Sequence, residues 1–182
     1  MLTKRLAFVI VLLSVAPAPA TGQGSVADRA LNDARAQWLQ RKGVHADIYV
    51  LAGSAAARSM PWIVSDAERA IAANLEWLGE RDPKGRLKLF FVGSRDEMRP
   101  FTGTRAGGWS IVAEGTAFFV ANDTVRPPLI HETMHLLSWR LWGMPGGRWL
   151  SEGVASLSAG GCRDWTIDQI GAALYHDRLL AT

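Results

Sequence analysis

The stretch His131-Glu132-Thr133-Met134-His135, followed by Trp149-Leu150-Ser151-Glu152-Gly153, decides how the rest of this chain must be arranged. Two histidines four positions apart on a helix project from the same face, about one turn from each other. Both imidazoles can therefore reach one metal ion, and such a site needs a third protein ligand from elsewhere in the chain. Glu152 is the acidic residue best placed to supply it.

The residues around the two histidines predict a helix that is partly buried. Pro127-Pro128 precede it, and proline is tolerated in the first turn of a helix, so we expect the helix to run from there to about Trp142. A second helix, from about Trp149 to Ala159, would carry Glu152 and end at Gly160-Gly161. The positions that flank the histidines are uncharged, which allows burial on the metal side: Leu129, Ile130, Leu136 and Leu137.

This residue set predicts one bound Zn²⁺ ion. A catalytic zinc keeps three protein ligands and one open position, and His131, His135 and Glu152 would be the three ligands. Glu132 lies beside the first ligand, where its carboxylate would act as general base on a water molecule. A histidine pair with this spacing is also consistent with two ordinary core or surface residues, and the downstream glutamate favours the metal interpretation.

Other zinc-hydrolase motifs do not fit the chain. A metzincin needs glycine three positions after the second histidine and a third histidine three positions further on, but this chain has Ser138 and Leu141 there. The inverted His-x-x-Glu-His order is also absent from the sequence. Glutamate as third ligand is the arrangement that remains.

The N-terminus predicts export. Lys4 and Arg5 precede a short apolar run, and Ala18-Pro19-Ala20 provides the small residues of a cleavage site, so we interpret residues 1–20 as a secretory signal peptide. An uncleaved signal-anchor is the alternative, although the run is short for a membrane span. Cleavage would place the protein outside the cytoplasm, secreted or in the periplasm or cell envelope, with no stable membrane anchor.

The composition argues against a nucleic-acid partner and against an intrachain disulfide. The formal charge of +3 falls to +1 because two basic residues and no acidic residue would leave with the signal peptide, so nucleic acid is not an expected partner. Cys162 is the only cysteine, which rules out an intrachain disulfide; a buried small side chain is a better interpretation than a metal ligand. Most of the eight tryptophans are expected in the core, although an aromatic binding platform is the alternative.

Periodicity along the remaining chain predicts a mixed α+β domain over residues 21–182, with helices dominating its second half. Capping-box patterns at Ser65-Asp66-Ala67-Glu68 and Ser94-Arg95-Asp96-Glu97 mark two helix starts, and Glu114-Gly115 marks a hairpin turn. We expect helices over 26–41, 65–78, 94–100 and 166–180, and strands over 45–51, 87–92, 109–113 and 116–120.

With these residues in place, the chain resembles the gluzincin metallopeptidases, in particular the small peptidase MA-like group, a minimal form of the thermolysin and aminopeptidase catalytic domains. The resemblance rests on His131–His135 and on Trp149 to Ala155, and extends more loosely back to the strand at Leu87. It implies a zincin-like fold, a small mixed sheet with an active-site helix and a following helix that bears the ligand glutamate. It also implies that the region from Trp109 to Val120 is the sheet edge lining the substrate cleft.

The chain departs from that family at two places. Many relatives have an acidic residue four positions after the ligand glutamate to orient a histidine, whereas this chain has Ser156, a weaker hydrogen-bond acceptor. Larger relatives also carry a transition-state stabiliser in a helical subdomain; Tyr175 and His176 are the candidates here, although we favour an ordinary surface position for both. Trp109 is the aromatic residue we expect to contact substrate.

The function predicted from these observations is that of an exported zinc metallopeptidase acting on a peptide or protein substrate, with Glu132 as general base. Two alternatives remain open. The chain could be a zinc-binding scaffold with weak or no turnover, because its C-terminal half is short, or the same site could hydrolyse a non-peptide amide.

Overall fold

The computed structural model describes residues 24–143, 147–162, 165–169 and 172. The predicted signal peptide, and Tyr175 and His176, lie outside the described residues. So does most of the helix expected over 166–180. No helix in the described part of the chain is long and apolar enough to cross a membrane.

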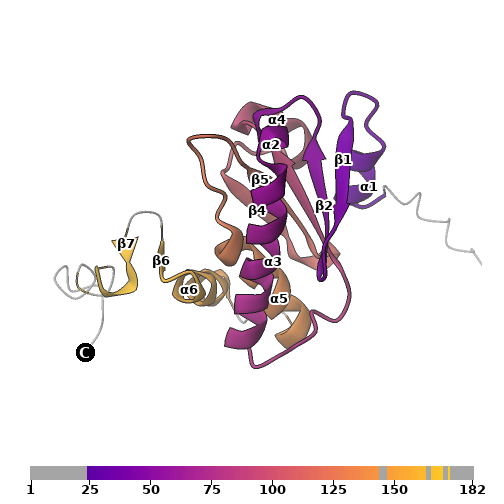
Figure 1. The fold of residues 1–182 in the computed structure, drawn as a ribbon. Coiled ribbons are helices and arrows are strands. Elements are labelled where there is room, and N and C mark those ends of the chain that lie inside the picture. Colours follow the sequence, from indigo (N-terminus) through magenta and orange to yellow (C-terminus); the bar gives the residue numbers. More distant parts are fainter. Residues whose placement is uncertain (1–23, 144–146, 163–164, 170–171, 173–182) are drawn as a thin grey trace, which may run out of the picture.

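A five-stranded mixed sheet forms the centre of the fold (Figure 1). In spatial order its strands run β1-β2-β3-β5-β4; the three central strands are parallel, and each edge strand is antiparallel to its neighbour. The mixed α and β composition and the mixed sheet confirm the coarse prediction of an α+β fold. The strands are β1 (Trp38–Lys42), β2 (Ala46–Leu51), β3 (Leu87–Val92), β4 (Gly108–Ile111) and β5 (Thr116–Val120).

Helices cover both faces of this sheet. The longest, α3 (Met60–Trp77), packs beside α5 (Leu129–Trp142) on one face, as Figure 1 shows. The opposite face is covered by α1 (Val26–Leu31) and α4 (Arg95–Thr102). The remaining elements are the short helix α2 (Ala55–Arg58), a 3₁₀ turn (Val112–Glu114), α6 (Arg148–Ser158), β6 (Gly161–Cys162) and β7 (Trp165–Thr166).

The central strands are apolar on both faces because both faces are covered. In β3, Leu89 and Phe91 belong to the core beneath α3 and α5, whereas Phe90 and Val92 point to the core beneath α1 and α4. Phe90 stacks on Phe118 with ring centroids 4.6 Å apart. The sheet is therefore packed on both faces, and it supports the helices on each face and the strands at its edges.

The helix predicted over 26–41 is wrong. The helix ends at Leu31, with Asn32 as its C-cap, and Trp38 begins strand β1 instead, paired with β2. The indole of Trp38 donates a hydrogen bond to the carbonyl of Ala30 at 2.9 Å and packs edge-on against Phe90. The apolar spacing that predicted one helix arises because the helix and the strand each bury residues in the same core, a contact that periodicity does not distinguish from a single helix face.

The helix start predicted at Ser65 is also wrong, because α3 begins five residues earlier at Met60 with proline in its first turn. Glu68, the expected capping residue, serves another purpose. Its carboxylate accepts hydrogen bonds from the backbone amides of His45 and Ala46 and contacts the His45 ring at 2.8 Å. It therefore ties α3 to the start of β2.

The helix start predicted at Ser94 is confirmed, although Glu97 bonds to the amide of Gly93 instead of the amide of Ser94 that a capping box uses. The Ser94 hydroxyl accepts a hydrogen bond from the Glu97 amide at 3.2 Å, and Glu97 accepts one from the Gly93 amide at 2.7 Å. The helix continues past Pro100 to Thr102. The structure confirms the strands at 87–92 and 116–120 and the two helices that carry the histidines and Glu152. β4 and β5 pair as the predicted hairpin, but β4 ends at Ile111, two residues before the expected Ala113, and a 3₁₀ turn over Val112–Glu114 leads into Gly115.

Candidate metal centre

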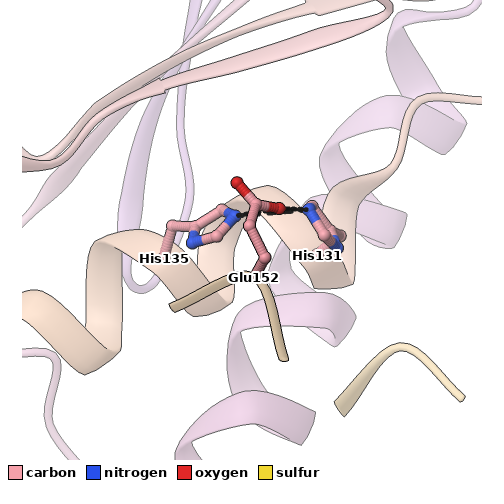
Figure 2. A group of neighbouring side chains, drawn as sticks. All are labelled: His131, His135 and Glu152. Carbon is pink, nitrogen blue, oxygen red and sulfur yellow. Dashed lines mark hydrogen bonds and ion pairs between the residues drawn. The ribbon is translucent and has the colours of Figure 1, made fainter. Parts of the chain in front are cut away.

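The three predicted ligands converge on one point. Nε2 of His131 lies 3.2 Å from Nε2 of His135, and Oε2 of Glu152 lies 3.4 Å from the first nitrogen and 3.7 Å from the second. Figure 2 shows both imidazoles rising from the same helix, α5, while the carboxylate of Glu152 reaches between them from α6. These atoms could hold a metal ion.

The orientation of His135 is set by a residue next to the third ligand. Nδ1 of His135 lies 2.9 Å from the hydroxyl of Ser151, so Nε2 is the ring nitrogen turned toward His131 and Glu152. Burial lowers the pKa of His135, and the neighbouring His131 adds to this shift, which favours the neutral imidazole that binds metals. Ser156, expected in this role, makes no hydrogen bond to either histidine within the described residues.

Glu152 approaches the site from the more exposed side. Its side chain is 48% exposed, and its second oxygen, Oε1, lies 3.8 Å from Nε of Arg148 one helical turn earlier. That contact draws one oxygen toward solvent and leaves the other facing the histidines.

Glu132 is the buried carboxylate of the site. Its residue is 9% exposed, and burial raises the pKa of its carboxyl, while a hydrogen bond donated by the Ser110 hydroxyl of β4 opposes that rise. A carboxyl with a raised pKa is a better proton acceptor near neutral pH than an exposed one. The predicted general base is therefore held against the edge strand and beside His131.

Strand β4 approaches Glu132 closely because residue 108 is glycine. A Cβ atom there would lie 2.7 Å from Cγ and 2.8 Å from Oε1 of Glu132, and 2.8 Å from Cγ of Pro128. Every side chain except hydrogen would therefore overlap the carboxylate or the proline ring. Gly108 is what allows Ser110, two residues along the same strand, to reach Glu132.

A buried amide connects α3 to the first turns of α5. Nδ2 of Asn74 donates hydrogen bonds to the carbonyl oxygen of Ile130 and to the Thr133 hydroxyl, both at 2.8 Å, and that hydroxyl donates to the carbonyl of Leu129 at 2.7 Å. Asn74 and Thr133 are almost wholly buried. Since His131 and Glu132 lie between the bonded residues, this network fixes the part of α5 that carries them.

A cleft of about 1140 Å³ opens beside the site, and both His131 and Glu132 line it. Trp109 lies on β4 with 42% of its surface exposed, but it is not among the described residues that line this cleft. The structure thus brings four of the predicted residues together, namely His131, Glu132, His135 and Glu152. Tyr175 and His176 lie outside the described residues.

Four residues that position the site were not identified from the sequence: Asn74, Gly108, Ser110 and Ser151. Only Ser151 had a usable signal, because it adjoins Glu152 and therefore had to lie near the histidines. The other three lie on α3 and β4, far from the histidines in the sequence, and no local pattern predicts that they contact α5.

Comparison of the chain with protein-family models found no match, and searches of curated proteins and of solved structures found none either.

Proposed function

We propose that this chain is a zinc-dependent metallopeptidase of gluzincin type, with His131, His135 and Glu152 as ligands and Glu132 as general base. The observation that carries the proposal is the convergence of three donor atoms beside a buried carboxylate that lines an open cleft. The pattern from Lys4 to Ala20 supports export, so we place the reaction outside the cytoplasm.

The donor set fits zinc. Ligands about 2.0–2.1 Å from a tetrahedral ion lie roughly 3.3 Å from one another. The three separations among the ligand atoms of His131, His135 and Glu152 are 3.2, 3.4 and 3.7 Å. Two imidazole nitrogens with one carboxylate oxygen are also the ligand set of catalytic zinc, which leaves a fourth position open.

In the proposed reaction, Glu132 transfers the proton and Ser110 positions Glu132. When bound, zinc lowers the pKa of a coordinated water and polarises a substrate carbonyl. Glu132 accepts the proton of the attacking water and returns it to the leaving amine, and its raised pKa suits both steps. The Ser110 hydroxyl holds one oxygen of Glu132, which leaves the other free to exchange the proton.

The edge strand β4 supports a peptide as substrate. Among the described residues β4 pairs only with β5, so we place an extended peptide as an added strand on its other side. The gluzincin resemblance implies this role for the whole region from Trp109 to Val120, but only β4 lies at the sheet edge, because β5 is flanked by β3 and β4.

Digestion of a proteome-derived peptide library, read by mass spectrometry, tests the proposal. We expect cleavage by the purified protein with one equivalent of zinc, loss of cleavage with 1,10-phenanthroline, and recovery when zinc is restored. Glu132→Gln should lower the rate about 10²- to 10⁴-fold, the range for removal of a general base, while zinc still binds. Glu76→Gln, an exposed glutamate on α3, is the matched control and should cleave like the wild type.

The same experiment separates the alternative. One bound zinc with no cleaved peptide, under any metal load, would contradict the peptidase proposal and leave the zinc-binding scaffold and the hydrolase of a non-peptide amide as the alternatives. Full activity in Glu132→Gln would contradict the assignment of the base.

A further inference from the structure

A charged cluster lies in the same cleft as His131 and Glu132. Four side chains compose it, and we call it the arginine cluster: Trp62, Asp66, Arg69 and Arg126. The first three belong to α3, and the fourth lies just before α5. The cluster takes no part in binding the metal or in holding Glu132.

The arginine cluster carries an excess of positive charge. Asp66 lies 2.5 Å from Nη2 of Arg69 through one oxygen and 3.6 Å from Nη1 of Arg126 through the other. Two guanidinium groups therefore share one carboxylate, and Asp66 is the one carboxylate that either of them contacts within the described part of the chain. Each guanidinium has five N–H donors, and most of them have no hydrogen-bond partner among the described residues.

Arg126 is positioned rather than free. Its guanidinium carbon lies 4.6 Å from the centroid of the Trp62 ring, a cation–π contact. Pro127 and Pro128 follow it directly and restrict the backbone between Arg126 and the helix that carries His131. The side chains of Arg69 and Arg126 nevertheless remain 71% and 77% exposed, which leaves them accessible to a ligand.

We infer that the arginine cluster is a substrate subsite that binds a carboxylate of the peptide being cleaved. Arginine's planar fork matches the two oxygens of a carboxylate, and the apolar surface of Trp62 and Pro128 beside it can receive the adjoining part of a peptide. The carboxylate can come from an aspartate or glutamate side chain or from the C-terminus of the peptide. The inference deepens the proposed function and rests on it, since it names the substrate class of the same cleft.

A binding measurement tests the subsite without requiring turnover. The probes are fluorescent hexapeptide libraries, acetylated and amidated at their ends, with one fixed position occupied by glutamate or by its neutral isostere glutamine. A second pair carries a free or an amidated C-terminus with no acidic residue. Anisotropy is recorded with zinc-loaded Glu132→Gln protein, so that no peptide is consumed.

In one of the two library pairs, we expect the member with the carboxylate to bind about five- to twenty-fold more tightly than the neutral member. This factor lies between the effect of an exposed ion pair and that of a hydrogen bond to a charged group. Which pair shows the preference identifies the source of the carboxylate. The preference should weaken as ionic strength rises. Arg126→Gln and Arg69→Gln should each reduce it, and Arg126→Glu should turn it toward peptides with a fixed lysine.

Arg41→Gln is the matched control, because Arg41 lies on β1 at the opposite edge of the sheet, and it should leave the preference unchanged. Thermal melting verifies that every variant is folded. Equal binding of both members of both pairs, or a preference that survives Arg69→Gln together with Arg126→Gln, would overturn the inference. A preference that depends on the arginines, in a protein that cleaves no peptide, would support the subsite and contradict the peptidase proposal.

Discussion

Gly108→Ala should disable the site while leaving the fold and the metal ligands in place. The added Cβ would lie 2.7 Å from Cγ of Glu132 and 2.8 Å from the Pro128 ring. Carbon atoms in contact are about 3.5 Å apart, so the neighbours must move by roughly 0.8 Å. The proline ring is held by its own backbone, so the shift falls on the Glu132 side chain or on β4.

A displacement of this size is large for a reacting group. A misplacement of about 1 Å can cost roughly 100-fold in rate, so we expect kcat to fall by about that factor. Overpacking typically costs about 1–3 kcal/mol of folding stability, which lowers the melting temperature without unfolding the protein. The zinc affinity should change little, because the three atoms nearest the added Cβ belong to Glu132 and Pro128 and not to the three proposed ligands.

The assay compares kcat, zinc affinity and melting temperature for Gly108→Ala and for Gly107→Ala. The second variant adds the same methyl group at the preceding residue, where nothing lies within 4 Å of the new atom, and we expect its kcat to stay within about twofold of the wild type. Wild-type kcat in Gly108→Ala would refute the argument that β4 positions Glu132. Equal losses in the two variants would refute the steric reason for it.

Two further changes test how neighbouring elements hold the site. Ser151→Ala removes the hydroxyl beside Nδ1 of His135, so zinc affinity measured against a competing chelator should fall about 10-fold or more, whereas Ser156→Ala should not change it; a larger effect at Ser156 would contradict this assignment. Asn74→Ala leaves the Thr133 hydroxyl and a carbonyl of α5 without their donor, so urea denaturation should show a loss of about 1–3 kcal/mol, and an unchanged free energy of unfolding would contradict the anchoring role.

Local sequence patterns predicted a helix or strand correctly where all residues of the pattern belong to that one element. The histidine pair, the proline-marked start of α5 and the cap at Ser94 each depend on residues within one or two turns of a helix. Prediction failed at Trp38 and at Ser65. In both cases a side chain contacts residues far away in the sequence. Trp38 packs against Phe90, and Glu68 bonds to the start of β2 instead of capping a helix.

The sequence by itself predicted which three side chains converge, because His131 and His135 share one face of a helix and Glu152 lies on the helix that follows. The tertiary structure alone decided how that set is supported. Ser110 reaches Glu132 only because β4 lies at the sheet edge against α5, and Asn74 reaches α5 only because α3 packs beside it. The physical reason is that metal-ligand spacing is a property of helix geometry, whereas hydrogen bonds between a helix, a strand and another helix depend on how the whole core packs.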